Sequence, residues 1–360
     1  MISGPLLITG GDGYLGSLVA RRLWEQTQEP IYLWVRASDP DELARKQHAI
    51  LTQFPCRVSV FGGDLTEPEP FGSVPWADVR VILHAAANIV FSVDETTARR
   101  VNVDGTAKLL AAARRSPKLH TLGYVSSIYV SGLRTGAVPE TMLDGEHGFA
   151  NHYERSKWQA ESKVSEARDL PWRIFRVATV VCDDDSGQVT QRNATHETLR
   201  LFYYGLLPLL PGRPETPLYF VTGAFASQAL VALIENGAPR EVYHVSHGPE
   251  ESLDLGTLVD LAYDVFAREA DFRERRILKP HFTDRDGFEL MVKGISPFPG
   301  VLSQSVAALA PFARQLYAPK KVENQHLRRV MPEYRAPDPR LLAERTIEHL
   351  VATRWGRRTT

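Results

Sequence analysis

The sequence predicts an α/β protein with a doubly wound parallel sheet of the Rossmann type and a smaller, mostly helical substrate domain. Short apolar runs alternate with amphipathic segments across the first half of the chain, which is typical of strand–helix–strand units. The first apolar run stops at a glycine-rich turn that opens a helix. Small and polar residues follow the later runs, and the carboxyl ends of parallel strands meet at one edge. We therefore expect one ligand crevice at that edge.

The composition excludes several classes of protein. The 360 residues are 24% charged with a formal net charge of −1, so we expect no nucleic-acid partner. Cys56 and Cys182 are too few and too far apart for a disulfide framework or a metal site, and they favour a reducing compartment. We see no signal peptide, and the longest apolar run is too short to span a bilayer. The expected location is cytoplasmic, without a transmembrane segment.

The expected elements follow the apolar periodicity along the chain. Strands are predicted at 5–9, 31–35, 57–61, 79–83, 120–125, 172–177, 217–221 and 242–245, and helices at 18–24, 95–115, 153–167, 195–204, 224–234, 253–266 and 337–355. The return of a strand at 242–245 after the helices suggests an interleaved second domain. We predict a nucleotide-binding domain of residues 1–182 plus 221–247, and a substrate domain or lid of 183–220 plus 248–360.

The glycine-rich turn is the first candidate site. Gly10 permits a tight turn, Gly13 lets the backbone approach a pyrophosphate, and Gly16 lets the helix pack closely on the strand. The spacing is Gly-x2-Gly-x2-Gly, which differs from the Gly-x-Gly-x2-Gly of dehydrogenase Rossmann domains. A glycine loop that binds nothing is the alternative.

The end of the second strand bears on cofactor choice. Arg36 lies 20 residues past Gly16, where an NAD-binding protein carries an acid for the ribose 2′-hydroxyl. An arginine can instead fork onto a 2′-phosphate, so NADP(H) is favoured, although Asp39 and Asp41 lie close by. Asp64, after the third strand, is either an acceptor for an adenine amino group or a turn-forming residue.

A tyrosine and a lysine four residues apart supply the candidate chemistry. Tyr153 and Lys157 open a helical run, so both side chains stand on one face. We expect the lysine cation to lower the phenol pKa and make Tyr153 a proton donor for a carbonyl group. The second such pair, Tyr317 and Lys321, contains Pro319 and cannot be a helical pair.

Taken together, these motifs resemble an extended short-chain dehydrogenase/reductase. Within that family, the chain is most similar to the thioester reductase and fatty acyl-CoA reductase (male-sterility-like) branch. The resemblance covers about residues 5–182 and departs from the family pattern at Ala178, where Pro or Gly is usual. The motifs occur in the family's order: Thr9-Gly10-x2-Gly13-x2-Gly16, Asp64, His84-Ala85-Ala86-Ala87, Asn102-x2-Gly105-Thr106, Ser127 and Tyr153-x3-Lys157.

The resemblance implies an NADPH-dependent reductase of a carbonyl compound. Tyr153 gives the proton, Lys157 lowers its pKa and holds the nicotinamide ribose, and Ser127 hydrogen-bonds the same substrate oxygen. Asn102 is expected either to position the active-site helix or to be purely structural. Cofactor contacts are expected at Gly10, Gly13, Tyr14, Leu15, Gly16, Arg36, Asp64, Leu65, Ala85, Ala86, Lys157, Ala178 and Val180.

The closer branch implies an acyl thioester substrate, CoA- or carrier-bound, that is reduced to an aldehyde, and the sequence leaves open whether a second hydride then makes the alcohol. Three alternatives remain at this stage: a ketone or hydroxysteroid-type oxidoreductase, a sugar-nucleotide enzyme, and a non-catalytic NADP-sensing protein. A homodimer is one assembly compatible with the family. The aromatic, proline-containing segment 280–335 is either the core of the small domain or a lid and apolar channel for an acyl chain.

Overall fold

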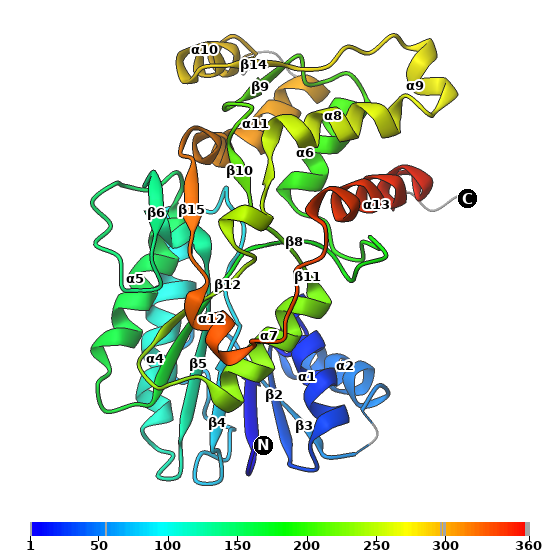
Figure 1. Ribbon diagram of the computed structural model, residues 1–360. Helices are drawn as coiled ribbons and strands as arrows, with labels where there is room; N and C mark the ends of the chain where they lie inside the picture. The colour runs from blue at the N-terminus through cyan, green and yellow to red at the C-terminus, as the bar shows by residue number, and fades with distance from the viewer. Residues whose placement is uncertain (1, 55, 296, 298–299, 357–360) are drawn as a thin grey trace.

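A parallel seven-stranded sheet forms the lower half of the molecule (Figure 1). The computed structural model describes residues 2–54, 56–295, 297 and 300–356. The strand order is β12-β7-β5-β4-β1-β2-β3, and every neighbouring pair is parallel. The strands are β1 (Leu6–Thr9), β2 (Ile31–Arg36), β3 (Val58–Gly63), β4 (Val81–His84), β5 (Thr121–Ser127), β7 (Trp172–Val177) and β12 (Val242–Val245). The predicted doubly wound sheet is confirmed.

Helices cover both faces of this sheet. On one face, α1 (Tyr14–Gln26) and α7 (Gly223–Asn236) bury an apolar cluster that includes Val19, Leu23 and Leu230. On the other, α4 (Gly105–Ala113) and α5 (His152–Glu166) bury a second cluster with Leu109 and Val164. The strand order reverses between β1 and β4, which is where open α/β sheets bind their ligands.

Two helical segments differ in detail from the predicted pattern. The predicted helix 95–115 is divided into α3 (Glu95–Ala98), the π-helical segment η1 (Arg99–Asp104) and α4. Helix α2 (Pro40–Leu51) was not expected from the sequence. The Asp39 side chain caps it by accepting from the Glu42 amide at 2.7 Å, and Pro40 occupies the first turn. Asp39 is therefore a helix cap rather than a competitor of Arg36 for the cofactor.

A second, smaller core lies above the carboxyl ends of the strands (Figure 1). Its helices are α6 (Ala194–Tyr203), α8 (Leu255–Phe266), α9 (Ala270–Glu274), α10 (Arg285–Ile295), α11 (Val301–Ala313) and α13 (Pro339–Ala352). Short strands and 3-10 turns connect them: β8 (Thr179–Cys182), β9 (Leu209–Pro211), β10 (Pro217–Leu218), β11 (Phe220–Thr222), η3 (Pro249–Glu251), β13 (Leu253–Asp254), β14 (His281–Thr283), η4 (Arg314–Tyr317) and η5 (Arg354–Gly356). The 3-10 turn η2 (Ile128–Ser131) follows β5 in the sheet half. In the part of the chain that the structure describes, no helix is both long and apolar enough for a membrane crossing.

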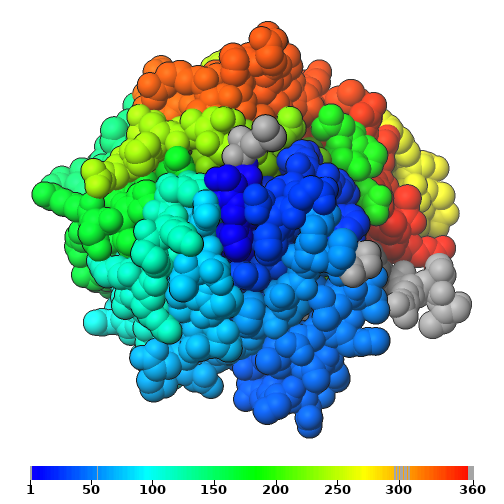
Figure 2. All heavy atoms as spheres, turned by 90° about the horizontal axis from the view of Figure 1, so that it is seen from below, coloured from blue at the N-terminus to red at the C-terminus, as the bar shows by residue number. Residues whose placement is uncertain are grey.

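One stretch of the expected substrate domain packs on the sheet half. Strand β15 (Lys320–Val322) pairs with β6 (Gly136–Val138), and α12 (Gln325–Val330) follows it. Val322 and Leu327 belong to the apolar cluster beneath α7, and Figure 2 shows the orange α12 region beside the yellow-green α7. The domain division remains a prediction, and this stretch connects its two halves.

Candidate active site

Tyr153 lies at the start of α5, next to the end of β5. The Asn151 side chain caps this helix by accepting from the Glu154 amide at 3.0 Å. The phenol of Tyr153 is buried beside Ser127, whose hydroxyl acts to lower the phenol pKa, so two of the predicted catalytic residues lie together. Ser127 is the last residue of β5, which explains how the sheet edge brings them together.

The predicted lowering of the phenol pKa is wrong for this structure. Burial, with a smaller contribution from the charge of Glu154, raises the pKa of Tyr153 to about 12, and the Ser127 hydrogen bond offsets only part of this rise. Lys157 does not reach the phenol. Its Nζ donates to the Val125 carbonyl at 2.7 Å and lies 4.2 Å from the centre of the Tyr124 ring. Tyr153 is therefore protonated at neutral pH, as a proton donor must be.

Lys157 is itself strongly perturbed. Burial lowers its pKa to about 7, although the nearby Glu161 carboxylate favours the charged form. The unfolded chain keeps its lysine protonated up to a pKa of ~10.4. Between these two values the unfolded state holds a proton that the folded state has lost. The free energy of unfolding therefore rises with pH across this window, and the cost of burying the cation is largest below it.

This cost leads to a prediction for Lys157→Met. At pH 6 we expect the variant to have a higher free energy of unfolding than the parent. Above pH 7 this difference should decrease, by up to about 1.4 kcal/mol for each pH unit. Denaturant unfolding from pH 6 to 9 measures it. Lys163→Met is the matched control, because Lys163 is exposed on the same helix and paired with Glu166. A stability difference between the Lys157 variant and the parent that is constant from pH 6 to 9 contradicts the argument.

Asn102 hydrogen-bonds both the loop after β4 and α5. It lies in η1, and π-helical turns are frequent at functional sites. Its Nδ2 donates to the Ser156 hydroxyl at 2.9 Å and to the Asn88 carbonyl at 3.0 Å, and its Oδ1 accepts from the Asn88 amide at 2.8 Å. Asn102 thereby ties the loop after β4 to α5.

The glycine turn has the geometry of a close-approach loop. Gly10 has φ +70°, and a Cβ there would stand 2.9 Å from the Ala86 amide. A Cβ at Gly16 would collide with the Gly10 carbonyl. Gly13 is the N-cap of α1, which has no side-chain cap, so free amides of the first turn remain for an anion. The loop after β4, with Ala85 and Ala86, therefore lies directly against the turn.

The two residues after Gly13 have structural contacts of their own. The Tyr14 hydroxyl donates to Asp183 at 2.6 Å, and burial together with that carboxylate raises the pKa of Tyr14. Leu15 packs against the core beneath α1. The Tyr14 hydrogen bond connects the glycine turn to the loop that leaves β8.

A pair of cations lies where a 2′-phosphate is expected. Arg36, at the end of β2, is exposed and its Nε lies 3.0 Å from Asp64. Lys46, on α2, donates to the Arg36 carbonyl at 2.6 Å and pairs with Asp12 of the glycine turn at 2.9 Å. The sequence argument did not find Lys46, because α2 was not recognised.

Asp64 is occupied by its own turn. One carboxylate oxygen accepts from the Thr66 amide and hydroxyl, both at 2.8 Å, and the other accepts from Arg36. These bonds lower the pKa of Asp64. The next residue, Leu65, is buried, and a Cβ added to Gly105 of α4 would meet its Cβ at 2.9 Å. The turn-forming alternative for Asp64 matches this geometry.

Ala178 and Val180 lie beyond the end of β7. The Ala178 amide donates to the Val245 carbonyl at 3.0 Å, and Val180 lies in β8 with its carbonyl bonded to Asn193. Two residues before Ala178, Arg176 is fully buried and forms a bidentate ion pair with Glu161 of α5, with the shortest contact 2.7 Å. This pair fixes α5 on the sheet.

Glu154 joins the active-site helix to the small domain. Its carboxylate is fully buried, accepts from the Ala150 amide at 2.9 Å and lies near Gln315 of η4, which acts to lower its pKa. Gln315 Oε1 in turn accepts from Lys320 at 2.6 Å. Burial raises the pKa of Glu154 to about 7 and lowers that of Lys320 to about 8. A buried polar network therefore ties η4 to the residue after Tyr153.

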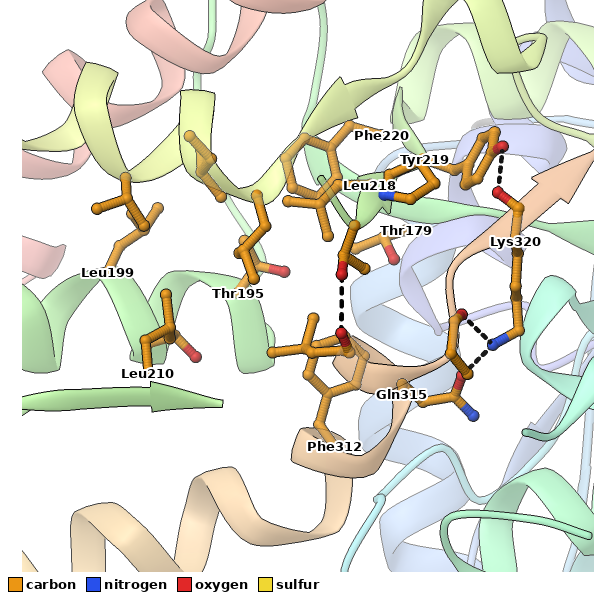
Figure 3. Close-up of a pocket in the computed structure, with 18 of the residues that line it drawn as sticks. Thr179, Thr195, Leu199, Leu210, Leu218, Tyr219, Phe220, Phe312, Gln315 and Lys320 are labelled. Atoms are coloured by element: carbon orange, nitrogen blue, oxygen red, sulfur yellow. Dashed lines mark hydrogen bonds between the residues drawn. The ribbon is translucent and has the colours of Figure 1, made fainter. Parts of the chain in front are cut away.

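Aromatic rings cover the phenol. Phe91 lies 5.3 Å from Tyr153 between ring centres and stacks on Phe312 of α11 at 5.7 Å. Tyr129, just after Ser127, meets both phenylalanines edge-on. The rings of Phe312 and Tyr129 also line a cavity in the small domain, shown in Figure 3. Segment 280–335 thus contributes both to the small core, through Phe288, and to the cavity wall.

Comparison with known sequences gives a family. Residues 8–230 match the family described as male sterility protein. Glycine betaine reductase ATRR of Emericella nidulans is 30% identical over 269 residues, which are 67% of this chain and 21% of that protein. Isonitrile lipopeptide synthase of Streptomyces coeruleorubidus is 28% identical over 211 residues, 54% of this chain and 14% of that protein. Fatty acyl-CoA reductase wat of Drosophila melanogaster is 25% identical over 220 residues, 49% of this chain and 43% of that protein. The chain thus spans less than half the length of each of these relatives.

Solved structures share the fold along nearly the whole chain. The terminal R domain from the myxalamid PKS-NRPS biosynthetic pathway has a TM-score of 0.75 at 19% identity, covering 98% of this chain and 91% of that one. A thiolation-reductase di-domain from an archaeal non-ribosomal peptide synthetase has a TM-score of 0.75 at 16% identity, covering 99% and 77%. These likenesses show the fold alone. With the family match, they establish that the chain belongs to the male sterility protein family of NAD(P)-binding oxidoreductases with the extended short-chain dehydrogenase/reductase fold.

Proposed function

We propose that this protein is an NADPH-dependent reductase that converts an acyl thioester to an aldehyde. The observation that carries the proposal is the buried Tyr153 phenol beside Ser127 at the end of β5, with Lys157 one turn further along α5. Both hydroxyls stand at the sheet edge that carries the glycine turn. A substrate oxygen between them receives a hydrogen bond from each.

The residues present fit a dinucleotide. The glycine turn suits a pyrophosphate for two reasons. Gly10 and Gly16 have no Cβ, so the backbone can approach the ligand closely, and the start of α1 has no side-chain cap. Arg36 and Lys46 supply two cations for a ribose 2′-phosphate, which favours NADPH over NADH. Lys157 would hold the nicotinamide ribose. The remaining predicted contacts at Asp64, Leu65, Ala85, Ala86, Ala178 and Val180 belong to the same proposal.

The chemistry divides between the cofactor and this chain. Bound NADPH supplies the hydride that the carbonyl carbon accepts. Tyr153 gives its proton to the oxygen that becomes negatively charged, and Ser127 holds that oxygen in place. The product of this step is a hemithioacetal, which expels the thiol and leaves the aldehyde. The high pKa of Tyr153 keeps the phenol in its donating form at neutral pH.

The thioester, rather than a ketone or a sugar nucleotide, is favoured by the relatives. Those that match the chain in sequence include a fatty acyl-CoA reductase, a glycine betaine reductase and an isonitrile lipopeptide synthase. The structural neighbours include a terminal R domain and a thiolation-reductase di-domain, so a carrier-bound acyl group is a candidate substrate beside acyl-CoA.

A substrate panel tests the proposal. NADPH absorbance is followed with acyl-CoA, acyl carrier protein, fatty aldehyde, a ketosteroid and a sugar nucleotide. We expect turnover with a thioester and release of free thiol. Turnover of the ketosteroid or the sugar nucleotide alone would remove the thioester assignment.

Cofactor choice gives a separate prediction. Arg36→Ala and Lys46→Ala should each weaken NADPH binding by about 10- to 100-fold and leave NADH binding nearly unchanged, because each removes a charge-assisted contact of about 1.5–3 kcal/mol. Titration calorimetry with both cofactors measures the effect. Arg21→Ala, an exposed arginine on α1, is the control. Equal NADPH affinity of the Arg36 variant and the parent would undo the 2′-phosphate assignment.

A further inference from the structure

The small domain contains an apolar cavity of about 80 Å³. It begins beside residues that follow the ends of β5 and β7, namely Tyr129 and Thr179, and extends among Leu199 and Leu210, which lie at the end opposite Lys320 in Figure 3. Its volume is several times the ~10–15 Å³ that one water needs. A cavity with apolar walls holds no water, and the side chains that line it lack packing partners on that side. An apolar ligand would supply those contacts.

Most of the polar side chains in its wall are bonded to the protein itself. Thr179 hydrogen-bonds the Tyr129 hydroxyl at 2.8 Å, and Thr216 donates to the Leu316 carbonyl at 2.8 Å. Lys320 donates to Gln315 at 2.6 Å and balances the charge of Glu154. Thr198 and Tyr219 also line the cavity and donate to the Ala194 and Lys320 carbonyls at 2.8 and 2.9 Å, and Thr195 adds a further hydroxyl to the wall. Most of the remaining wall is hydrocarbon, from Ile, Leu, Val, Phe, Pro and Ala side chains.

Two rings separate this cavity from the phenol of Tyr153. Tyr129 and Phe312 meet edge-on with ring centres 5.7 Å apart, both line the cavity, and both contact Phe91. Phe91 in turn contacts Tyr153. The partition is therefore a few aromatic side chains thick. Phe312 lies in α11, which is attached through Asn151 and the Pro311 carbonyl to the cap of α5.

We propose that the cavity holds the unbranched hydrocarbon tail of the acyl substrate, and that Tyr129 and Phe312 form the passage between tail and reacting carbonyl. This inference rests on the proposed function, because it names the substrate of the same site. Since most of the wall is hydrocarbon and most of its polar groups are bonded within the protein, it selects a saturated chain over a polar or charged one. The far wall, at Leu199 and Leu210, sets the longest tail that fits.

The parent protein should show a chain-length profile. For straight-chain acyl-CoA substrates, each added methylene should raise kcat/KM about fourfold until the cavity is filled, after which the gain stops. A thioester with a hydroxyl near the chain end should be a poorer substrate than its unsubstituted counterpart by about tenfold or more.

Two variants of the wall test the placement. Leu199→Phe fills the far end and should shift the optimum to shorter chains, with about tenfold loss for the longest good substrate and little change for the shortest. Leu258→Ala enlarges the cavity and should shift the optimum to longer chains. This variant can still be measured if Leu199→Phe does not fold. Leu350→Phe, buried on α13 and away from the cavity wall, is the matched control and should leave the profile unchanged.

A binding measurement separates this inference from the proposed function. Equilibrium dialysis with a labelled free fatty acid should show one site in the parent, weakened about tenfold in Leu199→Phe and unchanged in Leu350→Phe. Reduction of thioesters with the same kcat/KM at every length, or a profile that neither wall variant shifts, overturns the cavity assignment and leaves the reductase standing. Fatty acid binding that responds to Leu199, with no thioester reduced, overturns the reductase and keeps the apolar site.

Discussion

Replacing Tyr153 by phenylalanine is expected to lower kcat by about 10²–10⁴-fold, the usual contribution of a positioned proton donor. The ring keeps its contact with Phe91, so the fold is retained, while the hydroxyl that meets Ser127 is lost. Because the missing proton transfer belongs to the transition state, kcat and kcat/KM should fall together. Steady-state NADPH oxidation with an acyl thioester measures both.

The chain contains its own control for this variant. Tyr317 and Lys321 have the same spacing, but the Tyr317 hydroxyl donates to the Thr283 and Asp284 carbonyls in the small domain. Tyr317→Phe should therefore leave kcat nearly unchanged. Full turnover by the Tyr153 variant would remove Tyr153 as the donor, and an equal loss in both variants would point to a general structural effect.

The second large effect concerns stability. Arg176→Ala should reduce the free energy of unfolding by about 3–5 kcal/mol, because it leaves the fully buried Glu161 carboxylate without its partner. The double variant Arg176→Met with Glu161→Leu should recover most of this loss, since it removes both charges and keeps the volume. Denaturant unfolding of the parent, Arg176→Met, Glu161→Leu and the double variant measures the coupling.

An exposed pair gives the contrast. Arg114 and Asp169 are also bidentate, with contacts of 2.6 and 2.9 Å, but both side chains are about half exposed. Arg114→Ala should therefore cost about 0–1 kcal/mol. A double variant at Arg176 and Glu161 as unstable as the single one would mean that the pair has a role beyond charge compensation.

The features that sequence reasoning found are local ones. The glycine turn could be predicted from the sequence because Gly10 needs a positive φ and Gly16 has no room for a side chain. Both constraints require glycine, and the two glycines occur at a fixed spacing. The pairing of Tyr153 and Lys157 could be predicted because residues four apart lie on the same face of a helix. The parallel sheet followed from the alternation of apolar runs, and its strand order agrees with the one crevice expected.

The features that it missed depend on contacts between distant segments. Lys46 reaches Arg36 only because α2 folds back along β2, and Arg176 meets Glu161 only when α5 lies on β7. The phenol pKa of Tyr153 was expected to fall on spacing alone. It rises because burial dominates and the lysine amine is held by the Val125 carbonyl instead.

The reaction can be followed most directly with NADPH carrying deuterium at the transferred position of C4, in a single turnover with an acyl thioester. The account predicts that the released aldehyde carries one deuterium at its carbonyl carbon, with one equivalent of thiol released, and that the Tyr153→Phe variant forms this product far more slowly. An aldehyde without label, or cofactor binding with no labelled product from any thioester, would contradict it.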